Sequence, residues 1–218
     1  MNIKSDPIKR QVTVSAADMG QELSPMSPPE GREPPSDCKV AYEELHPFLQ
    51  QLIDDHDEFI SELHKIKSCV EEIKESRSLS KSSFEIMSKF LDYMADDFVE
   101  HNKREERVLF PILNKKLLDN NEHSPGPNPF TGIKVLEDDH LQATSFVAVL
   151  SNLLLLSSKI SHESSHAVLV NQIYKNAEEL LELLDLHIFR EDNIIFGQAQ
   201  NMLTAKEWTL VEQGFLAN

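Results

Sequence analysis

Large apolar residues recur at alternating intervals of three and four along four long stretches of the chain. This spacing places them on one face of an α-helix, because about 3.6 residues make one turn. We expect helices over about 47–75, 82–117, 133–159 and 164–200. A short fifth helix follows, since Thr204 and Glu207 have capping-box spacing. The pattern predicts an all-α protein, an up-down-up-down four-helix bundle with a short C-terminal fifth helix.

The first 38 residues lack this periodicity. Six of the eleven prolines fall before Asp37, and large apolar residues are few there. Such a segment cannot bury enough apolar surface to offset the entropy lost on ordering it. We therefore expect residues 1–38 to form a disordered tail, and residues 39–218 to form one domain with the bundle at its centre.

Six polar residues interrupt the apolar stripes of the four predicted helices, at positions that face the core. They are His56, His101, Glu105, His140, His187 and Glu191. Each half of the chain offers one histidine, followed by a histidine with a glutamate four residues later. The first two histidines are 45 residues apart and the last two are 47 apart, so the halves are near copies.

Buried carboxylates and imidazoles need partners, because an unpaired polar group in an apolar core costs several kcal/mol. A histidine and an acid four residues apart lie on one helix face, about 6 Å apart along the axis, so both can reach one metal or two adjacent metals. Two histidines and one carboxylate suit non-haem iron with open coordination positions. The duplicated set predicts a centre of two iron ions, with manganese or zinc as less favoured metals.

Two other acids compete for the carboxylate positions. Glu106 and Asp192 follow their histidines by five residues, about 100° further round the helix than Glu105 and Glu191. We assign Glu105 and Glu191 as ligands, and Asp192 stays open as the alternative in the second half.

Several residues beside the stripes have a structural interpretation that we prefer. We expect Tyr93 to pack against the core rather than to line a pocket. We also expect four acids that flank the histidines to be solvated, with a hydrogen bond to a ligand as the less favoured interpretation. These acids are Asp54, Asp55, Asp138 and Asp139.

Charge and composition limit the partners of the chain. It has 37 acidic residues against 21 Lys and Arg, a formal net charge of -16, which repels nucleic acid and anionic membranes alike. Its two cysteines, Cys38 and Cys69, suit a reducing compartment. The first residues contain no continuous apolar stretch, and the chain has no run of 18 apolar residues. We expect a cytoplasmic protein without nucleic-acid or membrane partners.

At its histidine motifs the chain resembles the hemerythrin-like, or HHE cation-binding, family. The resemblance covers about residues 45–216 and rests on four segments in order: DDHDEF, HNKREERVLFP, DDH and HIFREDNIIF. The segment LTAKEWTLVEQGF is also similar to the family's terminal segment. The resemblance implies a four-helix bundle with a non-haem di-iron centre held by the six residues named above. Ferritin-like bundles instead use Glu-x-x-His, which is absent at these sites.

The chain departs from the oxygen-carrying members of that family. They place a second histidine four residues after the third-helix histidine, where this chain has Thr144. Iron-repair relatives bring a fifth histidine from near the start of the second helix, and residues 65–100 contain none. An absent ligand opens the metal to solvent or substrate and alters its redox potential, which argues against reversible oxygen carriage.

These observations favour a di-iron protein that binds or senses oxygen, peroxide or nitric oxide. One alternative is a di-iron oxidoreductase acting on peroxide or another small oxidant. Another is a metal-responsive module that binds a protein partner, with the tail of residues 1–38 as its docking element.

Overall fold

The computed structural model describes residues 40–216, and within that range every regular element is a helix. The all-α prediction is therefore confirmed, whereas the predicted tail 1–38 lies outside the described residues. In chain order the elements are η1 (Tyr42–Glu44), α2 (Pro47–Ser76), α3 (Lys81–Arg104), η2 (Glu105–Leu109), α4 (Phe110–Asp119), α5 (Gly132–Ser157), α6 (Glu163–Arg190), η3 (Glu191–Ile195), α7 (Phe196–Met202) and α8 (Ala205–Leu216).

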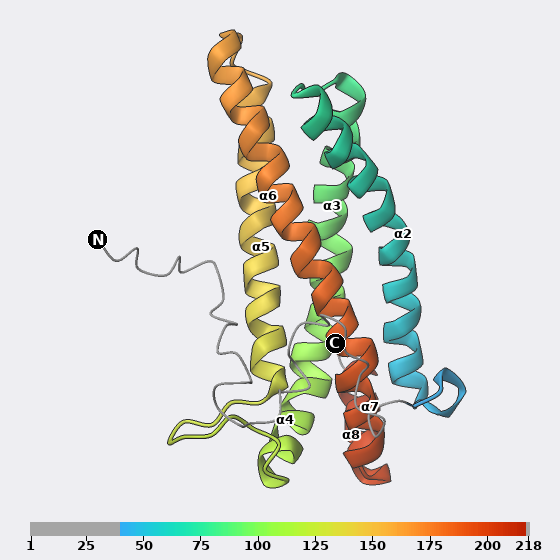
Figure 1. Cartoon of the computed structure of the whole chain (residues 1–218). Coiled ribbons are helices and arrows are strands. Elements are labelled where there is room, and N and C mark those ends of the chain that lie inside the picture. Colours follow the sequence, from blue (N-terminus) through green and yellow to red (C-terminus); the bar gives the residue numbers. More distant parts are fainter. Residues whose placement is uncertain (1–39, 217–218) are drawn as a thin grey trace.

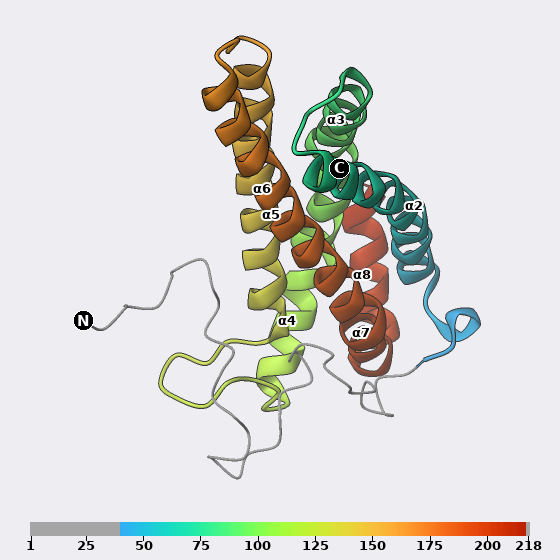
Figure 2. The same cartoon turned by 45° about the horizontal axis from the view of Figure 1, so that its top comes forward.

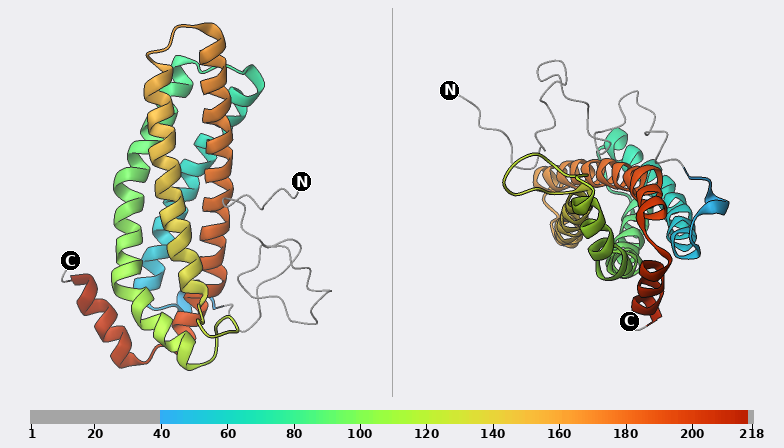
Figure 3. Two further views of the ribbon diagram at one scale, coloured as in Figure 1. Left: turned by 90° about the vertical axis from the view of Figure 1, so that its left-hand side faces the viewer. Right: turned by 90° about the horizontal axis from the view of Figure 1, so that it is seen from below.

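Four long helices lie side by side, and successive ones run in opposite directions (Figures 1 and 2). Helix α2 packs on α3 and α6, and α5 packs on the same two helices. The four therefore form a closed ring of neighbours. Below them, α4 continues the direction of α3 and packs on α5 and α7, while α8 returns against η2 (Figure 3).

The residues that the sequence marks as helix starts lie close to the observed N-termini of the helices. Pro47 is the first residue of α2, where its missing N–H costs nothing, and the His46 side chain accepts the Phe48 N–H. The second long helix begins at Lys81, one residue before the predicted position. Glu207 accepts the Thr204 N–H at 2.9 Å, so the short fifth helix is confirmed.

Two π-helical turns interrupt the helices that the sequence pattern predicts as continuous. They are η2 and η3, and in each the N–H five residues after the first residue donates to that residue's carbonyl: Phe110 to Glu105, and Phe196 to Glu191. Pro111 lacks an N–H and cannot bond the carbonyl of Arg107, which favours the wider turn in the first case. A π turn inserted into an α-helix often marks a functional site.

A buried polar layer separates two apolar clusters. The upper cluster, towards the α2–α3 turn, includes Phe59 and Phe98, and the lower cluster includes Leu52 and Val108. Each fully buried large apolar side chain contributes about 1.5–3 kcal/mol to folding. The six predicted ligand residues lie between members of the two clusters, so apolar packing on both sides holds the polar layer in place.

Helix α5 is unusually apolar. Among the described helices, it is long and apolar enough to cross a membrane by length and composition, and 28% of the relevant stretch is buried. One such helix is weak support for a membrane span, and α5 contributes Asp139 and His140 to the buried layer.

Candidate metal centre

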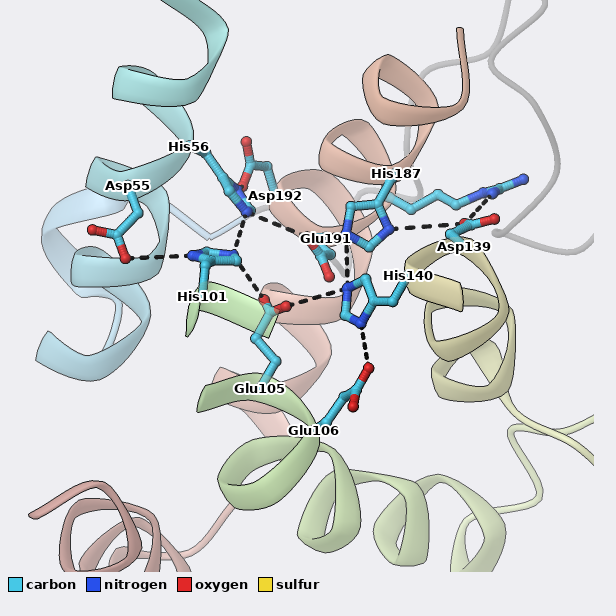
Figure 4. Close-up of polar contacts among 11 residues, drawn as sticks. Asp55, His56, His101, Glu105, Glu106, Asp139, His140, His187, Glu191 and Asp192 are labelled. Atoms are coloured by element: carbon cyan, nitrogen blue, oxygen red, sulfur yellow. Dashed lines mark hydrogen bonds and ion pairs between the residues drawn. The ribbon is translucent and has the colours of Figure 1, made fainter. Parts of the chain in front are cut away.

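The six predicted residues converge in the polar layer, from all four long helices (Figure 4). His56 comes from α2, His101 from α3, His140 from α5 and His187 from α6, while Glu105 and Glu191 begin the two π turns. No side chain of the six is more than 9% exposed. The structure therefore brings together every residue that the sequence pattern selects.

The donor atoms form two groups that share both glutamates. One group is His56, His101, Glu105 and Glu191, and the other is Glu105, His140, His187 and Glu191. Within each group the donor atoms lie within 4.8 Å of one another, close enough to hold a metal ion. Since the glutamates belong to both groups, the arrangement suits two adjacent ions with carboxylates between them.

Each glutamate contacts one histidine from each half of the chain. Glu105 lies 3.4 Å from His101 Nε2 and 3.6 Å from His140 Nε2. Glu191 lies 3.1 Å from His187 Nε2 and 3.3 Å from His56 Nε2. The paired Nε2 atoms are also close, at 3.0 Å for His56 and His101 and 3.1 Å for His140 and His187. All four Nε2 atoms therefore point into one space.

An outer carboxylate faces the other ring nitrogen of each histidine. His56 Nδ1 lies 2.7 Å from Asp192, and His140 Nδ1 lies 2.7 Å from Glu106. His101 Nδ1 lies 3.4 Å from Asp55, and His187 Nδ1 lies 3.8 Å from Asp139. A carboxylate that accepts the Nδ1 proton leaves the Nε2 lone pair free for a metal and fixes the ring orientation.

The competing acids lie in different positions relative to the histidines. Asp192 and Glu106 bind the outer nitrogens of histidines, whereas Glu191 and Glu105 occupy the centre.

The predicted solvation is wrong for one of the four flanking acids and holds only in part for a second, and both of these acids face a histidine. Asp139 is 1% exposed because it lies between His187 and the guanidinium of Arg190, and Asp55 is part-buried against His101. Asp54 and Asp138 are exposed, as expected.

Two arginines complete the duplication. Arg190 Nη1 donates to Asp139 at 2.9 Å in a buried pair, and Arg104 Nη2 lies 2.5 Å from Asp55 in a half-exposed pair. Each arginine directly precedes a central glutamate. Apolar periodicity did not single out these arginines, although both stand in a shared pattern, His-x-x-Arg-Glu-acid, in HNKREE and HIFRED.

The donor set fits a non-haem metal. All four side-chain oxygens of Glu105 and Glu191 are buried without a hydrogen-bond partner among the described residues. Buried carboxylate oxygens in that state are costly. A divalent cation beside them relieves this cost. Imidazole with carboxylate, and no thiolate, suits iron.

A cavity of about 160 Å³ reaches one side of the centre. It touches His56, His101 and His187 and is lined by Phe59, Tyr93 and Phe98. The expectation that Tyr93 does not line a pocket is therefore wrong, although its ring does stack on Phe59. Burial and nearby acids raise the pKa of Tyr93 to about 12, so its phenol stays protonated and can donate a hydrogen bond.

Thr144 lies on the opposite side of the centre and is exposed. Its hydroxyl donates to the His140 carbonyl at 2.9 Å. Thr144 also lines a shallow hollow of about 510 Å³ beside His140. This is the position at which oxygen-carrying relatives place another histidine, and here it borders solvent.

We predict that metal affinity rises with pH. Burial alone lowers the pKa of His187, but the charge of Glu191 and the nearby Asp139 raise it to about 9, from an ordinary value of 6.5. In the metal-free protein, the stability due to this shift is complete below pH 6.5 and is lost as pH rises through about 9. A metal needs the neutral imidazole, so its affinity should rise up to about tenfold per pH unit for one displaced proton.

Competition titration with Mn²⁺ at several pH values between 6.5 and 8.5 measures this dependence. The slope should flatten in a His187→Gln variant that retains measurable binding. A wild-type affinity that does not change over this range contradicts the prediction.

Comparison with known proteins agrees with the motif resemblance. The family model of the hemerythrin HHE cation binding domain matches residues 48–199. The chain is 24% identical over 113 residues to the iron-sulfur cluster repair protein YtfE of Cronobacter sakazakii, covering 52% of this chain and 46% of that protein. The proteins of the same name from Salmonella paratyphi B and Salmonella newport are 23% identical over the same length. The chain spans about half the length of these curated relatives.

Proposed function

Because the chain belongs to the hemerythrin HHE cation-binding domain family, we propose that its buried polar layer holds two non-haem iron ions. The scaffold is a four-helix bundle formed by the ring of α2, α3, α5 and α6. One ion is bound by His56 and His101 and the other by His140 and His187, with Glu105 and Glu191 shared between them.

The observation that carries this proposal is the sharing of the glutamates. Each glutamate lies within 3.6 Å of a histidine from each half of the chain, while its oxygens have no hydrogen-bond partner among the described residues. A single ion would leave one pair of histidines without a ligand role. Two ions use all six side chains and preserve the two-fold repeat.

The small cavity supports oxygen, peroxide or nitric oxide as the molecule that the centre binds or senses. Its volume of about 160 Å³ corresponds to a few water molecules. Phe59 and Phe98 supply part of an apolar lining to this space, and the Tyr93 phenol offers a hydrogen bond to a polar guest. Bound iron supplies electron transfer to or from such a guest. The exposed Thr144, in place of a fifth histidine, argues against reversible oxygen carriage.

A peroxide-reducing oxidoreductase is the second candidate, because the cavity touches three of the histidines at once. The relatives are named as iron-sulfur cluster repair proteins, but the match covers only 46% of the length of the first of them. The net charge of -16 supports our inference that neither nucleic acid nor an anionic membrane is a partner, and the two cysteines suit a reducing compartment such as the cytoplasm.

Metal analysis tests the proposal directly. Protein purified from iron-supplied cells should contain about two iron atoms per chain, with visible charge-transfer absorption, if all six side chains bind metal. The double variant His101→Ala/His187→Ala should contain less than about a tenth of that iron. The matched control is His64→Ala, which removes an exposed histidine of the same helix that carries His56. Wild-type protein that stays metal-free after anaerobic ferrous loading would refute the di-iron assignment.

Assays on the loaded protein separate binding from turnover. A sensor should bind nitric oxide or oxygen in the ferrous state with only slow consumption of peroxide. Rapid, repeated peroxide reduction with a supplied reductant would favour the oxidoreductase.

A further inference from the structure

From Leu141 to its C-terminal end, the outward face of α5 carries no charge and exposes several large apolar side chains. Leu141 is 67% exposed and Leu155 is 52% exposed, and Val149 and Leu156 are exposed on the same helix. From Leu141 to Ser158 the sequence contains no Asp, Glu, Lys or Arg, although 27% of the whole chain is charged. In Figure 3, left, α5 is turned towards the viewer, and no other described element lies over it. An exposed apolar face of this length usually marks an interaction site.

The exposed residues follow the spacing of a helix-packing seam. We call Leu141, Ser145, Ala148, Asn152 and Leu155 the α5 stripe; its members are separated by four, three, four and three residues and all are exposed. This alternation keeps the side chains in line along a helix and is typical of two packed helices. Ala148 lies at the middle of the stripe, and its small side chain allows two helix axes to approach closely.

The polar members of the stripe are already satisfied within α5. Ser145 Oγ donates to the Leu141 carbonyl at 2.9 Å, and Asn152 Nδ2 donates to the Ala148 carbonyl at 2.7 Å. A polar group that has a partner loses less free energy on burial than an unpaired one. Burying the α5 stripe in an interface therefore costs less free energy than its serine and asparagine side chains would cost if they were unpaired.

We infer that the α5 stripe is covered by the same stripe of a second copy of this chain, in antiparallel orientation. A two-fold axis at Ala148 brings together residues that are equally distant from it along the helix. Leu141 then meets Leu155 of the second copy, since each lies seven residues from Ala148. The apolar ends of the stripe are in this way self-complementary.

Charges at the ends of the α5 stripe support this occupant and this orientation. Glu137 is exposed on α5 and Lys159 is exposed in the turn that directly follows it, and each lies eleven residues along the sequence from Ala148, one on either side. The antiparallel arrangement places Glu137 of each copy opposite Lys159 of the other. A parallel arrangement would pair like charges instead, which is unfavourable. A lipid surface offers no such matched charge, and the net charge of -16 disfavours anionic lipid.

Association would also affect the metal layer. Leu141 and Thr144 border the hollow beside His140, so a second copy on the α5 stripe narrows this opening. The cavity beside His56 and Tyr93 is lined by α2, α3 and α6 and stays open. The dimer therefore leaves the cavity beside His56 and Tyr93 accessible.

Analytical ultracentrifugation of the full, metal-loaded chain over a concentration series tests the inference. The wild type should form a dimer, and Leu155→Glu should raise its dissociation constant at least about 100-fold, because each interface then buries two carboxylates in place of two leucines. The matched control is Leu210→Glu on α8, a leucine 57% exposed, which should change the constant by less than about threefold. Unchanged iron content in both variants shows that they fold.

A charge exchange tests the orientation. Glu137→Lys and Lys159→Glu should each weaken the dimer by about tenfold, since two attractive pairs become repulsive, and the double variant should return to within about threefold of the wild type. A wild type that stays monomeric at about 100 μM overturns the inference, as does a dimer that Leu155→Glu leaves intact. Failure of the double variant to recover overturns the antiparallel arrangement. Flotation with phospholipid vesicles that depends on Leu155 assigns the α5 stripe to lipid instead.

Discussion

Replacing Glu105 with glutamine should abolish tight metal binding at both positions while leaving the metal-free protein folded. The glutamate lies within 3.6 Å of a histidine from each half, so its loss removes a donor from both ions. We expect the metal affinity to fall more than about 100-fold. Loss of a residue that only hydrogen-bonds to a metal ligand typically lowers the affinity by about 10–100-fold. Glutamine keeps the volume and can donate to an imidazole nitrogen, so the unfolding free energy without metal should change by less than about 1 kcal/mol.

The metal-dependent gain in stability separates this result from misfolding. A ligand at 100 times its dissociation constant stabilises the folded state by about 2.7 kcal/mol. Wild-type thermal unfolding should therefore shift upward on adding ferrous iron under anaerobic conditions, and Glu105→Gln should show no shift. The matched control is the adjacent Glu106→Gln, which removes only the outer partner of His140 and should keep a reduced shift. Equal iron content and equal shifts in Glu105→Gln and the wild type would show that Glu105 is not a shared ligand.

Replacing Arg190 with methionine should destabilise the protein by about 3 kcal/mol, a value typical of breaking a buried ion pair by removing one partner. Arg190 is 3% exposed and Asp139 is 1% exposed, so water cannot solvate the remaining carboxylate. For a chain of this size we expect the melting temperature to fall by about 10 °C. Asp139 also faces His187 Nδ1, so the affinity for the second metal should fall.

The internal repeat supplies the control for this variant. Arg104 occupies the same position in the first half, but its side chain is 26% exposed and that of its partner Asp55 is 33% exposed. Because water can replace the lost contact, Arg104→Met should cost less than about 1 kcal/mol. Chemical denaturation of both variants measures the difference. Equal losses would mean that burial does not distinguish the two arginines.

The spacing of apolar residues was enough to predict the helices and the six central side chains. His56, His101, His140 and His187 stand in apolar stripes, and a helix with a period of 3.6 turns every member of a stripe to the same side. Four such stripes must face one another to be buried. The convergence of the six residues follows from periodicity, and their repeated order pointed to a metal before any contact was known.

The two π turns could not be found in this way. A π turn changes the register of a helix by a fraction of a turn over five residues, which the periodicity of a long stripe does not reveal. Glu105 and Glu191 are the first residues of these turns, and the acid that follows each one faces the outer nitrogen of a histidine, His140 for Glu106 and His56 for Asp192.

The sequence by itself determined the six central residues of the polar layer, because periodicity is a local property of each helix. Only the tertiary structure decided which outer acid serves which histidine: Asp192 pairs with His56 although 136 residues separate them. The tertiary structure also made the two halves unequal, since it buries Arg190, leaves Arg104 half-exposed and opens a cavity beside His101. Burial and pairing across helices depend on how the helices dock, and near-identical motifs acquire different surroundings when different neighbours cover them.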